Sequence, residues 1–239
     1  FLVKEHYIPV KKKQGGSLSL YLQTALRTPY SLRICLVIAF TFVAGQLVMN
    51  YYRLFTKEQL GLDPEQALKP FSWMPIITLV ASMPVAYICD RFRLYKSMTL
   101  TGALLVAGAG LTGVFATSST HLMAMAILMG LSVVCMAVGL NAYTLSFMPP
   151  DKIGQLSGFQ NIFRGGPRFI MFFATGFLVE QFSRNYRIAF AGAILCVIVA
   201  ILILLPMPRE GVYAREAAAP KDGSSEPNLA EATAERPHS

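Results

Sequence analysis

A short charged cluster at residues 90–96, Asp-Arg-Phe-Arg-Leu-Tyr-Lys, separates two apolar runs, 70–89 and 97–120, and neither run contains a charged residue. A helix of about 20 apolar residues crosses the hydrocarbon core of a bilayer, so each run is long enough to span it. A basic turn between two spans faces the cytoplasm by the positive-inside rule. The cluster therefore predicts two membrane helices and sets the orientation of every other segment.

The balance of apolar and charged residues excludes an ordinary soluble domain. Hydrophobic residues make up 54% of the chain and charged residues 14%, whereas soluble domains carry about 25% charge. A soluble fold of this composition would expose large apolar patches. The net charge is +8, but the basic residues lie beside the apolar runs and form no aromatic–basic patch. This indicates a lipid bilayer with anionic headgroups as the partner, and no nucleic acid.

The remaining apolar runs complete an all-α membrane protein with a bundle of six helices at 34–208. The predicted spans are about 34–52, 67–89, 97–117, 121–147, 160–180 and 188–208. Residues 1–33 form a cytoplasmic linker, in which 17–32 fit either a short helix on the membrane surface or a plain linker. Residues 209–239 are rich in Ala, Pro, Glu and Ser and predict a disordered cytoplasmic tail.

The distribution of basic residues supports this topology. With both ends in the cytoplasm, the cytoplasmic segments hold 14 Lys and Arg residues and the exterior loops hold 5. Such an excess is typical of the cytoplasmic side.

Three local patterns predict how the helices begin, bend and pack. Asp63, followed by a proline and then Gln66, predicts a capped helix start with a capping box. Gly165-Gly166-Pro167 predicts an interruption of the fifth span, as in the discontinuous helices of transporters. Ala109 and Gly113 form a pair of small residues that lets a neighbouring helix approach closely.

Catalysis has no support in the motifs. The chain has no Gly-x-Ser-x-Gly, no His-Glu-x-x-His and no P-loop, and its histidines lie in loops or at the edge of a span. The four cysteines lie in apolar runs without metal-ligand spacing. We therefore expect no enzyme, no metal and no cofactor, and we look for function among polar groups inside the spans, because these are costly there.

Gln46 and Asn50 are four residues apart in the first span and share one helix face. They fit a wall that offers amide donors and acceptors to a polyhydroxylated solute, or a polar contact between helices. Asn141 and Tyr143 in the fourth span are further candidates for substrate binding near the cytoplasmic end. Trp73 fits either a platform for stacking a sugar or an anchor at the membrane interface.

Arg164 and Arg168 also lie four apart, and Arg168 is expected at the edge of the hydrocarbon. An unpaired cation there would cost about 2.5–3.5 kcal/mol. Such an arginine reaches towards the cytoplasm, pairs with an acid or faces a watery cavity. No Asp or Glu lies deep within a predicted span, so a carboxylate that couples transport to an ion is expected outside this chain.

The charged cluster resembles the intracellular loop signature of the major facilitator superfamily, Gly-x-x-x-Asp-Arg-x-Gly-Arg-Arg/Lys. Asp90 and Arg91 agree with it, and Lys96 lies one residue after its last basic position, whereas Ala86 and Arg93 replace its two glycines and Leu94 replaces an arginine. The resemblance implies a secondary active transporter of alternating access, in which the first and fourth spans line the cavity. It also implies a gate formed by Asp90 and Arg91. Lys96, Arg164 and Arg168 are further candidates for gating residues. A turn that only sets topology is the alternative.

The chain has a basic linker before the first span and a polar tail after the last, and in this it resembles the C-terminal half of such a carrier. We therefore expect the chain to be a fragment. Its expected partner is an N-terminal half of six helices. Segments 3–9 and 150–155 are similar to bacterial sugar carriers near the glycoside–pentoside–hexuronide group. This resemblance implies symport of a small polar solute, a sugar or a glycoside, across a bacterial inner membrane. A six-helix membrane scaffold without a substrate is the alternative.

Overall fold

The computed structural model describes residues 30–148, 153–209 and 211. Its helices are α2 (Ser31–Glu58), α3 (Pro64–Phe92), α4 (Tyr95–Val114), α5 (Ser119–Cys135), the π-helix η1 (Met136–Leu140), α6 (Asn141–Leu145), α7 (Ile153–Gln181) and α8 (Arg187–Leu204). Six stretches are long and apolar enough to cross a membrane, the fourth being α5, η1 and α6 together. The predicted all-α architecture of six long apolar helices is confirmed. The surface helix considered for 17–32 and the expected tail fall largely outside the described residues.

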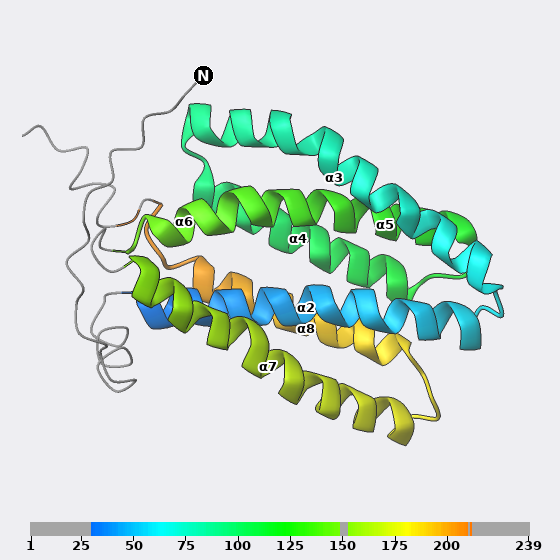
Figure 1. Cartoon of the computed structure of the whole chain (residues 1–239). Helices are drawn as coiled ribbons and strands as arrows, with labels where there is room; N and C mark the ends of the chain where they lie inside the picture. Colours follow the sequence, from blue (N-terminus) through cyan, green and yellow to red (C-terminus); the bar gives the residue numbers. More distant parts are fainter. Residues whose placement is uncertain (1–29, 149–152, 210, 212–239) are drawn as a thin grey trace, which may run out of the picture.

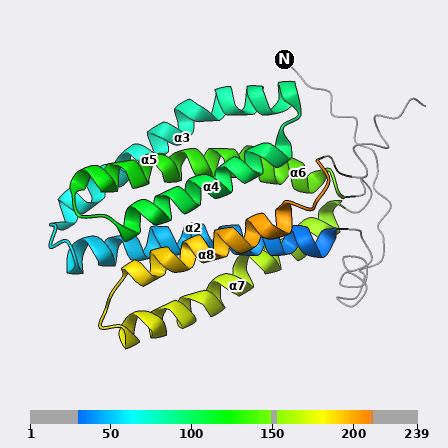
Figure 2. The ribbon, with the colours of Figure 1, turned by 180° about the vertical axis from the view of Figure 1, so that it is seen from behind.

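The long helices lie side by side, with α3 and α7 at opposite sides of the bundle (Figures 1 and 2). Between them, α2 packs against α7 and α8, α8 against α4, and α4 against α5, which also contacts α3. We call the end where α3 meets α4 the Asp90 end, and the opposite end, where α2 meets α3, the Glu58 end.

Close packing in the middle of the bundle depends on small residues. A Cβ added to Gly113 of α4 would lie 2.8 Å from the ring of Phe190 in α8. Phe190 is fully buried and meets Phe55 of α2 edge to face, with ring centroids 5.2 Å apart. Because lipid tails are as apolar as these side chains, helices associate by such van der Waals contact. Gly113, of the predicted small-residue pair, therefore lies at a close helix contact.

Both ends of α3 follow local rules, with one correction. Asp63 is the N-cap and Pro64 the first helical residue, but the Asp63 side chain makes no capping hydrogen bond. The predicted capping box is therefore not formed. At the other end Arg93 is left-handed, with φ 50°, and Leu94 N–H donates to the carbonyl of Cys89 at 3.1 Å. A helix end of this kind favours glycine at the left-handed position.

The connection between α2 and α3 is short, residues 59–63, because α2 continues to Glu58 and α3 begins at Pro64. One expectation about α7 is wrong. The interruption expected at 165–167 does not occur, since α7 is a single helix through Pro167. A proline removes only one backbone donor, and a long membrane helix tolerates this loss when its neighbouring turns are intact.

The Glu58 end is held by polar contacts between turns. The hydroxyl of Tyr186 donates to the Glu58 carboxylate at 2.9 Å. Burial of this hydroxyl, and then its hydrogen bond to Glu58, raises the pKa of Tyr186 above its usual value. The contact connects the end of α2 to the start of α8.

Candidate functional site

A cavity of about 1030 Å³ lies between α2 and α3. From α2 it is lined by Gln46, Met49, Asn50, Tyr52 and Arg53, and from α3 by Leu68, Phe71, Ser72, Met74, Pro75, Thr78, Leu79 and Ser82. It is large enough for a small organic solute. The polar side chains of this lining are amides, hydroxyls and one arginine, and none is a carboxylate.

The structure brings together the two amides predicted from the first span. Asn50 Nδ2 donates to the backbone carbonyl of Gln46 at 2.8 Å and to its Oε1 at 3.1 Å. These bonds hold both amides on the cavity face of α2. Gln46 Nε2 and Asn50 Oδ1 form no hydrogen bond with any other described residue, so a donor and an acceptor remain for a solute.

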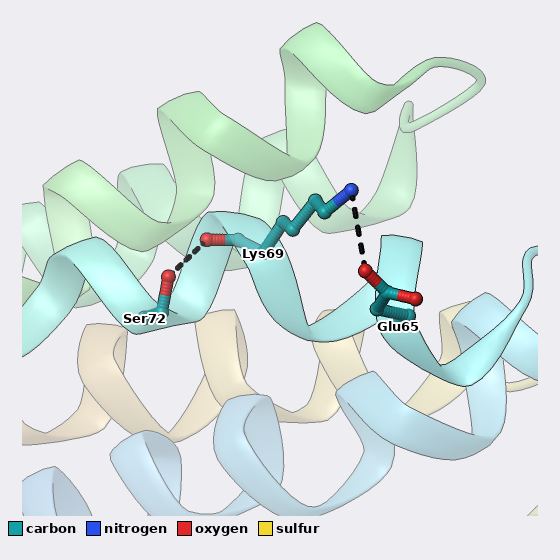
Figure 3. A network of polar contacts seen from close by, with 3 residues as sticks. All are labelled: Glu65, Lys69 and Ser72. Atoms are coloured by element: carbon teal, nitrogen blue, oxygen red, sulfur yellow. Dashed lines mark hydrogen bonds and ion pairs between the residues drawn. The ribbon is translucent and has the colours of Figure 1, made fainter.

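Hydroxyl groups supply the polar part of the α3 wall. Ser72 Oγ donates to the carbonyl of Lys69 at 2.7 Å, one turn from the exposed ion pair between Lys69 and Glu65 at 3.6 Å (Figure 3). Thr78 and Ser82 likewise donate to carbonyls of their own helix. Each hydroxyl satisfies the backbone with its proton and keeps lone pairs that can accept a hydrogen bond.

Asn141 and Arg164, predicted for different roles, are in contact. Arg164 Nη2 donates to Asn141 Oδ1 at 3.0 Å, and the guanidinium carbon lies 5.0 Å from the centre of the Phe42 ring. Phe42 is one helical turn before Gln46 on α2. The pair therefore lies on the same side of α2 as the cavity, one turn closer to the Asp90 end.

Tyr143 lies elsewhere. Its side chain is buried in the cluster at the Asp90 end, where its ring meets Phe147 edge to face at 5.0 Å. Its hydroxyl donates to the carbonyl of Pro208 at 2.7 Å. This residue holds the end of α8 and is not among the residues that line the cavity between α2 and α3.

The residues expected at the gate differ in their surroundings. Arg91 is exposed, and Asp90 Oδ1 receives only a long hydrogen bond of 3.5 Å from the Tyr95 hydroxyl. Neither forms an ion pair with a described residue. Lys96 Nζ donates to the carbonyls of Leu205 and Met207. A cation at the carboxyl end of a helix stabilises it, so Lys96 caps α8 in this structure.

Arg168 and Trp73 both lie on the surface of this chain. Arg168 is exposed, and its guanidinium carbon is 5.6 Å from the ring centre of Phe172, one turn further along α7. Trp73 is 52% exposed and does not line the cavity. The sugar platform considered for Trp73 is therefore absent from this site.

Sequence reasoning missed the π-helix η1, which comes directly before Asn141. A Cβ on Gly139 would lie 2.8 Å from both Met98 Cβ and Thr99 N, so the backbones of η1 and α4 approach closely. Asn141 Nδ2 donates to the carbonyl of Ala137 at 2.9 Å. Short π-helical segments are frequent at functional sites, and the glycine was the only signal of this one.

Comparison with known proteins gives one result. The family model of the Major Facilitator Superfamily matches residues 34–230. No curated protein and no solved structure matches the chain.

Proposed function

The chain belongs to the major facilitator superfamily, and we propose from this premise that its cavity between α2 and α3 binds a small polar solute of the sugar or glycoside class. Membership makes it a multi-pass membrane protein of a family of secondary transporters, which are not enzymes. A solute therefore crosses the bilayer through this protein.

The observation that carries the proposed solute class is the pair of amides on the cavity face of α2. Gln46 and Asn50 are fixed by their mutual hydrogen bond and keep a free donor and acceptor. The opposite wall offers the hydroxyls of Ser72, Thr78 and Ser82. Neutral donors and acceptors on two facing walls are what a polyhydroxylated solute requires.

We further propose that this chain is the C-terminal half of the carrier and packs against an N-terminal half of six helices. Large apolar side chains on α3 support this, since Met83 is 82% and Val80 70% exposed. In this arrangement the Asp90 end and both chain ends face the cytoplasm of a bacterial inner membrane. Symport would take its ion through a carboxylate of the other half.

The gate in this proposal is formed by Asp90 and Arg91, with Arg168 as a further contact. All three are exposed here and form no ion pair with a described residue, so they are available to a partner half. Replacing Asp90 with Asn should slow turnover and leave solute affinity unchanged in transport kinetics.

Uptake into proteoliposomes tests the cavity. Labelled sugars and glycosides are offered to the complete protein and to Gln46→Ala and Asn50→Ala. Each lost hydrogen bond should weaken apparent affinity by about 3- to 10-fold. Gln59→Ala is the matched control, because this amide lies at the Glu58 end, where Nε2 donates to Asn185 Oδ1 at 3.3 Å. Unchanged affinity in both cavity variants would contradict the proposed site, and absence of uptake by the wild type would favour a scaffold.

A further inference from the structure

Arg164 is held over the face of α2 that carries the solute wall. Its guanidinium carbon is 5.0 Å from the Phe42 ring centre, and Phe42, Gln46 and Asn50 follow one another at intervals of one turn. Arg168, one turn further along α7, is exposed and lies over a ring of its own helix instead. The guanidinium of Arg164 therefore lies beside the face of α2 that carries Gln46 and Asn50, one turn from Gln46.

No described carboxylate balances this charge. The Asp and Glu residues that the structure describes all lie at or beside helix ends: Glu58, Asp63, Glu65, Asp90 and Glu180. The single ion pair among them joins Lys69 and Glu65 at the Glu58 end (Figure 3). Arg164 lies in the first half of α7, away from these groups. A cation inside a membrane protein without a counterion marks a functional site by default.

Only some of the N–H donors of Arg164 have a hydrogen-bond partner. Nη2 donates to Asn141 Oδ1 at 3.0 Å, and Nε is buried without a hydrogen-bond partner in the described part of the chain. A guanidinium has five N–H donors in a planar fork that matches the two oxygens of a carboxylate or phosphate. A neutral amide and an aromatic face orient this fork but do not neutralise it.

Asn141 is itself fixed by the π-helix. Its Nδ2 donates to the carbonyl of Ala137, within η1, at 2.9 Å. The side-chain amide therefore supplies a partner to a carbonyl of the π-helix, and its Oδ1 is turned to Arg164. A guanidinium held from two directions in this way is pre-organised for a ligand.

We propose that Arg164 binds an oxyanion, a carboxylate or a phosphate, carried by the transported solute, while Gln46 and Asn50 bind its hydroxyl-rich remainder. Asn141 is the positioning residue of this contact. The inference rests on the proposed transport function and adds the charge of the solute. A sugar acid or a sugar phosphate satisfies both parts of the site.

The test compares matched neutral and anionic probes on the complete protein purified in detergent. Glucose is compared with glucuronate and with glucose 6-phosphate, and glycerol with glycerol 3-phosphate, all at equal ionic strength. We expect an anionic member to raise the melting temperature more than its neutral counterpart, because a ligand that binds the folded state stabilises it. Preference for glucuronate over the phosphates would indicate a carboxylate, and the reverse a phosphate. Absence of any anion preference would overturn the proposal.

Substitution then assigns the preference to Arg164. Arg164→Gln should weaken binding of the preferred anion by about 10- to 100-fold, since it removes a charge-assisted bond. Arg33→Gln is the matched control, because Arg33 also lies over an aromatic ring, that of Tyr30 at 5.7 Å, but near the start of α2, away from Gln46 and Asn50. Retained anion preference in Arg164→Gln would overturn the assignment.

A second variant keeps the test decisive if Arg164→Gln fails to fold. Asn141→Asp places a carboxylate beside the guanidinium, so it should abolish the anion preference without lowering the melting temperature. An Asn141→Asp protein that still prefers anions would overturn the proposal. If neutral probes bind and Gln46→Ala weakens them, the proposed transport site stands and only the charge of the solute is wrong.

Discussion

The helices of this chain fall into two groups that differ in what they contact. In the most apolar windows of α2 and of the fourth span, 56% and 50% of residues are buried, and in α4 and α8 39% each. In the corresponding windows of α3 and α7, 0% and 11% of the residues are buried. The first group makes its contacts within the chain. The second faces outwards, yet α3 forms one wall of the cavity and α7 carries Arg164. Stability is thus concentrated in the inner group, and the polar site lies where the two groups meet.

The largest expected effect tests this division with two phenylalanines. Phe190→Ala in α8 should destabilise the protein by about 3–5 kcal/mol, because a fully buried ring is replaced by a cavity. Phe173→Ala in α7, where the ring is 68% exposed, should change stability by less than about 0.5 kcal/mol. Thermal unfolding in detergent measures both.

The outcome for Phe173 sharpens the comparison. If the α7 variant loses as much stability as the α8 variant, the outer face of α7 is packed against protein. The division into inner and outward-facing helices would then hold within this chain but not in the assembled protein. Equal and small losses would instead show that Phe190 is not part of a tightly packed core.

Much of the fold could be predicted because a bilayer imposes strong rules. Length and hydropathy predict six long helices, and the Asp63-Pro64 pair predicts the start of α3. The face shared by Gln46 and Asn50 follows from a spacing of four residues in one helix. These are properties of single segments, which periodicity can identify.

Contacts between segments could not be predicted. Nothing near Tyr143 in the sequence indicates that its hydroxyl meets the carbonyl of Pro208, or that Lys96 caps α8. The contact between Arg164 and Asn141 joins two helices, and a π-helix turns Asn141 towards it. Each of these depends on how helices pack, which the pattern of a single segment does not contain.

A smaller difference in stability is expected when a glycine of each group is replaced by alanine. Gly139→Ala should destabilise by about 1–3 kcal/mol, because the new Cβ would meet the backbone of α4 at Thr99 N, 2.8 Å away, and backbone cannot move aside easily. Gly165→Ala in α7 has no neighbouring atom within 4 Å, so it should stabilise by about 0.5–1 kcal/mol through helix propensity. We expect Gly139→Ala to lower the melting temperature and Gly165→Ala to raise it. A destabilised Gly165→Ala protein would mean that another protein surface lies against α7.

The smallest effect concerns Arg93, in the turn that joins the outer α3 to the inner α4. Arg93 is left-handed, with φ 50°, where the superfamily loop signature has glycine. Arg93→Gly should therefore stabilise the turn by about 0.5–1 kcal/mol, the strain released being partly offset by the greater freedom of glycine in the unfolded chain. Arg91→Gly removes the same charge from the last turn of α3 and should destabilise by about 0.5–1 kcal/mol, since its backbone is helical. Unfolding curves of the two variants distinguish backbone strain from loss of charge. If both shift in the same direction, the charge of this turn matters more than its geometry, and the boundary between the two groups is held by electrostatics.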